Sequence, residues 1–152
     1  MDLELPQDFK ELFRSLNANK VEYLLIGGYA VICHGYVRNT IDIHVVVSNE
    51  RENAERIVEA LTDFGFGGLG LDVALFTDPD SLVRMGVEPI KIEILNYLKG
   101  VSFDLAYSRR KTQQVEDIEV SLIDLQDLIS NKKAVGRLKD LADVEELEKR
   151  NK

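Results

Sequence analysis

The sequence predicts a small α/β (α+β) domain in which a mixed β-sheet is flanked by helices. Segments with apolar residues at helical spacing alternate with short apolar runs that are typical of strands. The chain has 152 residues, 45% hydrophobic and 30% charged, which is enough to bury a core without disulfides or metals. It contains no repeat, low-complexity tract or linker-like composition, so we expect residues 1–152 to form a single domain.

Helices and strands are expected to alternate in the first half of the chain. Residues 6–20 form the first predicted helix, because their apolar side chains recur every three or four positions. The elements expected after it are a strand at 21–28, a short helix at 29–36, a strand at 41–47, and a helix at 49–65 with Ser48 as its N-cap.

The second half begins with a glycine-rich segment, residues 65–89, which we expect to be irregular. Its GFGGLG, residues 65–70, matches the GxGxxG pattern of dinucleotide-binding proteins. A helix rather than a strand precedes it, so a helix end followed by a loop is the better interpretation. Further strands are expected at 89–98 and 118–123, followed by C-terminal helices at about 124–150.

Composition and charge exclude several classes of function. The net charge of −8 argues against broad binding to a nucleic-acid backbone, although SRRK at 108–111 is either a local phosphate contact or a solvated loop. No apolar run approaches the roughly 18 residues of a membrane span, and the acidic, helix-like N-terminus does not resemble a signal peptide. The single cysteine, Cys33, fits a reducing compartment, so we expect a cytoplasmic protein with no membrane partner.

Two predicted strands carry polar side chains that could hold a metal. Asp42 and His44 alternate with apolar residues and therefore point the same way. A buried carboxylate requires a partner, and Glu93 on the later strand is a candidate second ligand. Converging carboxylates are what divalent cations need for phosphoryl transfer. The alternative is structural: Asp42 pairs with Arg38, and Glu93 faces solvent on an edge strand.

A turn before the acidic strand could bind phosphate. Gly27 and Gly28 end a strand, where glycine lets backbone N–H groups approach an anion. Arg38 and Thr40 precede Asp42 and offer a guanidinium and a hydroxyl to phosphate oxygens.

These segments together resemble the nucleotidyltransferase superfamily with the DNA-polymerase-beta-like fold. GGYAVICHGYVRNTIDIHVVV resembles its signature of paired glycines, a short helix and an acidic strand, and KIEIL resembles the strand with the third carboxylate. The C-terminal LIDLQDLISNKKAVGRLKDLADVEEL is similar to the tail of AbiEii-like and related minimal members. The resemblance covers roughly residues 21 to 147.

The resemblance implies transfer of a nucleoside monophosphate from a nucleoside triphosphate to a hydroxyl, with Mg²⁺ or Mn²⁺. The acceptor could be a nucleic acid, a protein or a small molecule. The residue roles that it implies are nucleotide binding by Gly27, Gly28, Arg38, Thr40, Lys132 and Arg137, orientation by Asp140 and Asp143, and catalysis at the metal by Asp42, His44 and Glu93.

His44 departs from the family pattern, because it stands where the second metal-binding carboxylate is expected. A neutral imidazole is a poor ligand for Mg²⁺ but suits transition metals such as Zn²⁺. Two alternatives follow from this substitution: a catalytically weakened binding module, such as half of a toxin–antitoxin pair, or a site rebuilt around a transition metal.

Overall fold

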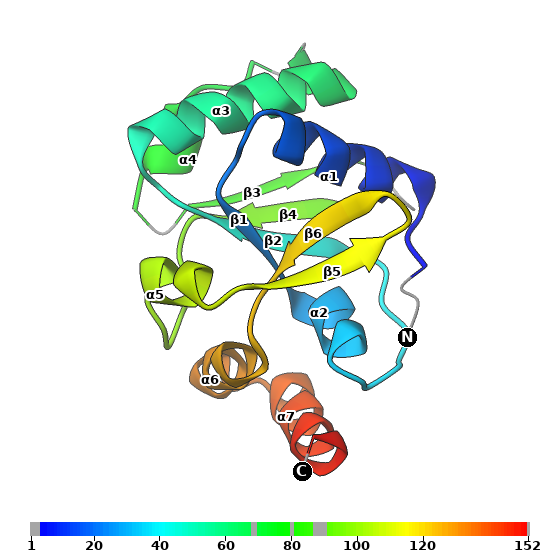
Figure 1. Cartoon of the computed structure of the whole chain (residues 1–152). Coiled ribbons are helices and arrows are strands. Elements are labelled where there is room, and N and C mark those ends of the chain that lie inside the picture. Colours follow the sequence, from blue (N-terminus) through cyan, green and yellow to red (C-terminus); the bar gives the residue numbers. More distant parts are fainter. Residues whose placement is uncertain (1–3, 68–69, 80, 87–90, 152) are drawn as a thin grey trace.

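The chain folds around one six-stranded mixed sheet (Figure 1). The computed structural model describes residues 4–67, 70–79, 81–86 and 91–151. The sheet order is β3-β4-β2-β1-β6-β5, which confirms the predicted α/β class. The strands are β1 (Tyr23–Ile26), β2 (Ile43–Val47), β3 (Leu82–Met85), β4 (Ile92–Leu95), β5 (Lys111–Val115) and β6 (Ile118–Leu122).

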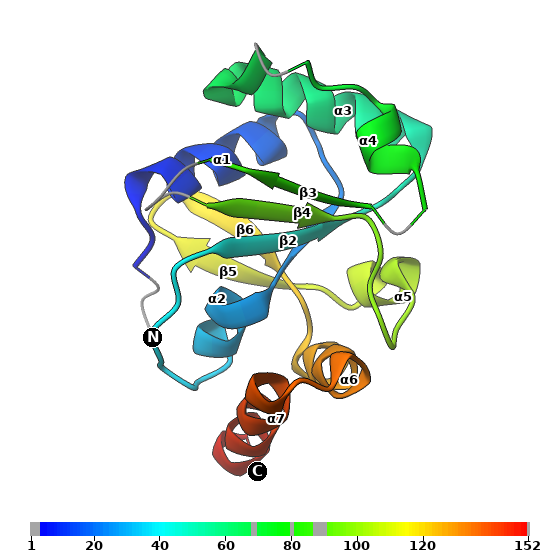
Figure 2. The ribbon, with the colours of Figure 1, turned by 180° about the vertical axis from the view of Figure 1, so that it is seen from behind.

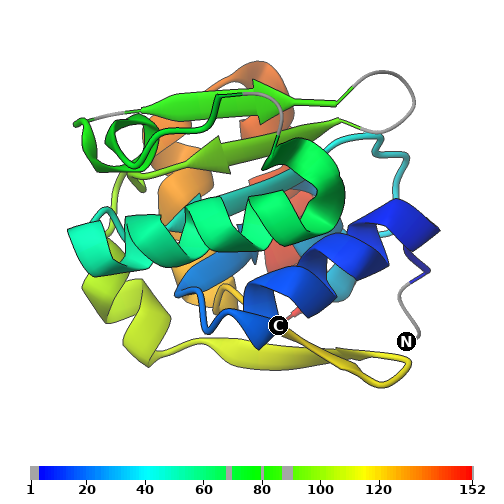
Figure 3. The same ribbon diagram turned by 90° about the horizontal axis from the view of Figure 1, so that it is seen from above.

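Helices cover both faces of this sheet. Among the described residues they are α1 (Gln7–Ala18), α2 (Gly27–Cys33), α3 (Arg51–Leu61), a π-helical turn η1 (Thr62–Phe66), α4 (Ala74–Thr77), α5 (Phe103–Ser108), α6 (Leu125–Val135) and α7 (Leu138–Arg150). The helices α1, α3 and α4 lie on one side, and α2, α6 and α7 lie on the other (Figures 2 and 3). None of the described helices is long and apolar enough to cross a membrane.

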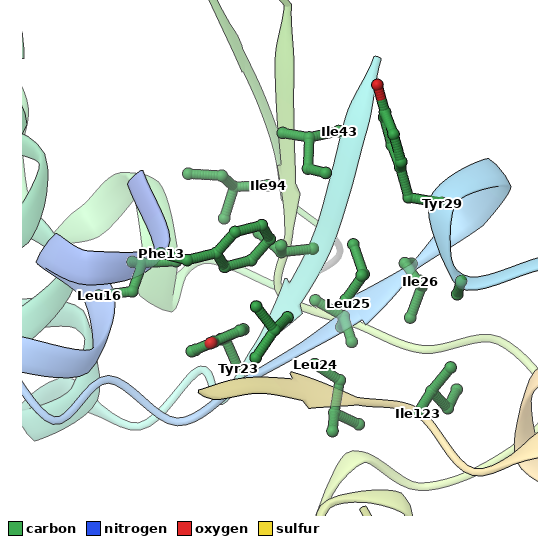
Figure 4. Packing of buried hydrophobic residues seen from close by; sticks show 14 of the residues in the cluster. Phe13, Leu16, Tyr23, Leu24, Leu25, Ile26, Tyr29, Ile43, Ile94 and Ile123 are labelled. Carbon is green, nitrogen blue, oxygen red and sulfur yellow. The ribbon is translucent and has the colours of Figure 1, made fainter. Parts of the chain in front are cut away.

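The core lies between the central strands and the helices on either face. All four residues of β1 are buried, as expected for a central strand that is covered on both sides. From α1, Phe13 and Leu16 pack toward β1 and β4, and the ring centroids of Phe13 and Tyr23 are 5.6 Å apart (Figure 4). The helical spacing predicted for α1 is therefore the spacing of its buried face.

The sequence prediction missed both edge strands. β3 falls within the segment 65–89 that was expected to be irregular, and β5 begins within the SRRK segment 108–111. Most side chains of these two strands are not buried. An edge strand packs against one neighbour only, so it does not need the apolar pattern that identifies a buried strand. The same prediction placed a strand at 89–98; residues 89 and 90 lie outside the described part of the chain.

Two predicted helix starts were also wrong. The N-cap of α3 is Glu50, not Ser48, and it has no side-chain cap; the Ser48 hydroxyl instead accepts a hydrogen bond from the Glu50 backbone N–H (3.3 Å). The helix α2 begins at Gly27, two residues earlier than expected. The glycine pair is therefore the first turn of α2, directly at the end of β1.

Candidate functional site

One row of residues crosses three neighbouring strands. In the parallel pairing of β2 and β4, His44 lies opposite Glu93, and in the antiparallel pairing of β3 and β4, Arg84 lies opposite the same glutamate. Residues paired in register project from the same face of a sheet. The three side chains therefore meet on the face that α2, α6 and α7 share.

Glu93 is held from both sides. Its Oε2 lies 2.9 Å from His44 Nε2, and its Oε1 accepts a hydrogen bond of 2.6 Å from Arg84 Nε. The Glu93 side chain is only 17% exposed, because β4 lies inside the sheet. The structural alternative, in which Glu93 faces solvent on an edge strand, is wrong.

Asp42 immediately precedes β2 and faces the same cavity as His44 and Glu93. It makes no ion pair or hydrogen bond with another described residue. The alternative pairing of Asp42 with Arg38 is wrong, because the Arg38 guanidinium binds Asp143 through two bonds of 2.8 and 2.9 Å. Asp42 is thus the carboxylate whose oxygens remain available to a ligand.

The imidazole of His44 lies in a mixed environment. Burial lowers its pKa, the carboxylates of Glu93 and Asp42 oppose that shift, and the charges of Lys139 and Lys132 add to it. The net effect lowers the pKa of His44 from its usual value of 6.5, which favours the neutral imidazole. A neutral imidazole supplies none of the negative charge that a carboxylate at this position would give to a cation.

The glycine pair is required by close packing. A Cβ on Gly27 would lie 3.0 Å from three atoms of His44, and the backbone there has φ +72°. A Cβ on Gly28 would lie 2.8 Å from Thr40 Cβ. Glycine therefore brings the first turn of α2 against both His44 and the Thr40 loop.

Gly27→Ala is expected to destabilise the protein by about 1–2 kcal/mol for the left-handed backbone and by about 1–3 kcal/mol more for overpacking against His44. Gly70→Ala is the matched control, because Gly70 has φ +67° and open space around it. Urea unfolding of the two variants measures the difference. Equal losses of stability in the two variants would show that His44 can move away from a side chain at position 27 without an energetic cost.

A buried ionic network connects the C-terminal helices to the turn before β2. Lys132 on α6 is buried, with its Nζ 3.2 Å from Asp140 Oδ1 and 3.0 Å from Asp143 Oδ2. Both aspartates, on α7, are also buried. Arg38 binds Asp143, and Arg137 binds Asp140 with a bond of 2.7 Å. The network fixes the positions of three basic side chains, those of Arg38, Lys132 and Arg137, at the edge of the cavity that Asp42, His44 and Glu93 face.

Stability should depend on pH through these aspartates. Burial alone would raise both pKa values, but hydrogen bonds and charge from Arg137 and Lys132 lower the pKa of Asp140, and those from Arg38 and Lys132 lower the pKa of Asp143. A depressed folded pKa stabilises the protein above the unfolded value, about 3.9. The free energy of unfolding should therefore fall as the pH drops below about 4. Urea titrations at a series of pH values test this, and Lys132→Ala should weaken the dependence.

The nine residues to which the sequence assigned catalysis, metal binding or nucleotide binding all line one cavity of about 570 Å³, whereas the two orienting aspartates, Asp140 and Asp143, do not line it. The residues that the sequence missed are Arg84, Lys91 and Lys139, together with Asn39 and Ile41. Among the described residues that line the cavity, six carry basic side chains and two carry carboxylates, although the chain as a whole has a net charge of −8. If Lys91 is left out of the count and the two aspartates of the ionic network are included, the described residues still give five basic groups against four acidic ones.

A second hollow of about 310 Å³ adjoins this cavity. The two share His44, Arg84 and Glu93 among their lining residues. Its walls are mixed. The apolar residues that line it are Ile26, Leu82, Leu95, Tyr97, Leu98 and Val135, and its other polar residues are Lys99, Asn131, Lys132, Arg137 and Asp140. A charged pocket thus opens beside a less polar one.

The residues of the site do not fit a two-magnesium centre. Among the described residues no group of three or more histidine, cysteine, aspartate or glutamate side chains is arranged to hold a metal ion. Both oxygens of Glu93 are occupied, and His44 offers nitrogen where Mg²⁺ prefers oxygen. Of the predicted set Asp42, His44 and Glu93, only Asp42 presents an unpaired carboxylate.

The fold is that of the nucleotidyltransferases. The chain is similar to the lincomycin-bound lincosamide antibiotic adenylyltransferase LnuA, with a TM-score of 0.64 and 13% identity over 97% of this chain and 98% of that one. It is also similar to a candidate nucleotidyltransferase from Thermotoga maritima, with a TM-score of 0.58 and 13% identity over 93% of this chain and 88% of that one. A nucleotidyltransferase-like protein from Paracoccidioides brasiliensis matches with a TM-score of 0.54 and 14% identity, over 90% and 71% respectively.

Comparison with family models and with curated protein sequences gave no match. The fold expected from the sequence is therefore confirmed by structure, and the AbiEii-like subtype stays a prediction.

Proposed function

We propose that this protein binds a nucleoside triphosphate, with its phosphates in the 570 Å³ cavity, and transfers the nucleoside monophosphate to a hydroxyl acceptor, which loses its proton as pyrophosphate leaves. The observation that carries the proposal is the excess of basic side chains in that cavity within an acidic chain. Such an excess attracts a polyanion selectively to one place. The nucleotidyltransferase fold supports the identity of that polyanion as a nucleotide.

The basic side chains suit phosphate because their positions are fixed. Arg38 and Lys132 are held by buried aspartates, so little side-chain entropy is lost when they meet an anion. Lys139 is exposed, lines the cavity, and makes no ion pair with a described residue. It is free to respond to a bound phosphate.

The adjoining hollow fits the acceptor. Its mixed lining offers apolar contacts to the body of a small molecule and polar contacts to its hydroxyl groups, and it shares His44 and Glu93 with the phosphate cavity. The lincomycin bound to the similar adenylyltransferase is a small molecule. We therefore place small hydroxyl compounds before nucleic acids or proteins as acceptors.

Calorimetric titration with ATP, GTP, CTP and UTP tests the binding step. Lys139→Ala should weaken binding about three- to tenfold, as expected for the loss of one charged contact. Lys149→Ala is the control, since it removes the same charge from a position outside the cavity. Absence of binding by any of the four nucleotides would refute the proposal.

Transfer is tested with α-labelled nucleotides and a panel of hydroxyl-bearing small molecules, nucleic acids and the protein itself. Labelled product that depends on Asp42 would support transfer, with Asp42→Asn as the comparison.

The second candidate is a nucleotide-binding module without transferase activity, of the kind found in toxin–antitoxin partners. The observation that favours it is that both carboxylate oxygens of Glu93 are already paired, one with His44 and one with Arg84. Under this hypothesis the nucleotides bind, no product forms with any acceptor, and a partner protein binds to the nucleotide-loaded form.

A further inference from the structure

The place of a metal centre in this fold is taken by side chains that already balance one another's charge. Glu93 lies between His44 and Arg84 in a single row across β2, β4 and β3. Each of its carboxylate oxygens has a partner at 2.6 or 2.9 Å. A divalent cation bound to Glu93 would first have to displace one of them.

The partner on the open side is a permanent cation. Arg84 contacts Glu93 through Nε, and its side chain is 72% exposed while it lines both the main cavity and the adjoining hollow. A guanidinium carries five N–H donors, of which this contact uses one. The others make no hydrogen bond with a described residue, and their fork geometry suits bidentate contact with phosphate oxygens.

The charge of the cavity also differs from that of a site that recruits cations. A metal centre needs several carboxylates that repel one another until a cation enters. Here Asp42 is the one lining carboxylate without an ion pair among described residues, and basic groups outnumber acids. The positive charge that a polyphosphate requires is supplied by the protein itself.

We propose that Arg84, Glu93 and His44 form an ionic row that replaces the metal centre, so that the cavity binds the phosphates of a nucleotide without a divalent metal. This inference rests on the proposed nucleotide binding. Arg84 supplies the cation, Glu93 fixes its direction, and His44 holds Glu93 without adding negative charge. Because Mg²⁺ reduces the charge of ATP, the metal-free nucleotide is the better ligand.

The test is calorimetric titration of the intact chain with ATP and with inorganic tripolyphosphate, each in excess EDTA and in excess Mg²⁺. The expected result is that ATP binds at least as tightly in EDTA as in Mg²⁺. Arg84→Ala should weaken binding in EDTA about tenfold, as for one charged hydrogen bond, and Arg84→Lys should recover part of the loss. Tripolyphosphate binding with the same dependence on Arg84 would assign the recognition to the phosphates.

Arg56→Ala is the matched control, because Arg56 carries the same charge on α3, outside the cavity. Binding that requires Mg²⁺ would overturn the ionic row and leave the proposed function standing. Metal-free binding that Arg84→Ala and Arg56→Ala affect equally would overturn the role of Arg84. Absence of binding in every arm would refute both the row and the proposed function.

Discussion

Replacing Lys132 with alanine is expected to lower the free energy of unfolding by about 3–5 kcal/mol, the typical cost of breaking a buried ion pair by removing one partner. Lys132 is 6% exposed and is the charge that Asp140 and Asp143 share. Without it, two buried carboxylates lie close together with only Arg137 and Arg38 to balance them. Such a loss is a large part of the 5–15 kcal/mol that stabilises a typical domain.

The neighbouring lysine is the control. Lys133 lies on the same helix and pairs with Glu148 at 3.4 Å, but both side chains are more than half exposed. An exposed pair contributes about 0–1 kcal/mol, so Lys133→Ala should have little effect on urea unfolding. Similar losses in the free energy of unfolding of the two variants would contradict the view that Lys132 is a buried charge on which Asp140 and Asp143 depend. If Lys132→Ala does not fold, Lys132→Met, which keeps the apolar stem, gives the same comparison at a lower packing cost.

The central part of the fold was predictable because burial leaves a pattern in the sequence. Strands β1 and β2 are covered on both faces and read as apolar runs, and α1 shows its buried face as a helical repeat. The edge strands β3 and β5 leave no such pattern. Each of them pairs with only one neighbouring strand and has its other edge toward solvent, so polar residues are tolerated there. Arg84 was missed for the same reason, since it lies on an edge strand that was not predicted.

The residues of the site were predictable as a set, but their contacts were not. The spacing of Asp42 and His44 shows that they share a face, and the glycine pair and Arg38 precede them in the sequence. Whether Glu93 binds a metal or an arginine depends on the register of β3 against β4. Register between distant segments is set by tertiary packing, which a single sequence does not display. The pairing of Arg38 with Asp143, 105 residues away, has the same origin.

His44→Asp should convert the ionic row into a metal-responsive site. The new carboxylate would lie beside Glu93 and near Asp42, in the row where His44 Nε2 is now 2.9 Å from Glu93 Oε2. Like charges at such separation oppose ionisation of one another, so in EDTA we expect a loss of about 1–3 kcal/mol relative to the wild type, the range for an uncompensated buried group. Excess Mg²⁺ should reverse the loss, since a ligand at a hundred times its Kd stabilises the folded state by about 2.7 kcal/mol. For a chain of this size that is a rise in Tm of roughly 5–10 °C.

His44→Asn separates charge from shape in this experiment. Asparagine has the size of aspartate but no charge, so its Tm should be the same in EDTA and in Mg²⁺, as should that of the wild type. A Tm of His44→Asp that is equally insensitive to Mg²⁺ would show that position 44 does not face a place where a cation can bind. A wild-type Tm that rises with Mg²⁺ as much as that of His44→Asp would show that the imidazole already tolerates the metal. We expect Mg²⁺ to raise the Tm of His44→Asp only. Of the three proteins, this variant alone has an additional oxygen ligand and an additional negative charge next to Asp42 and Glu93.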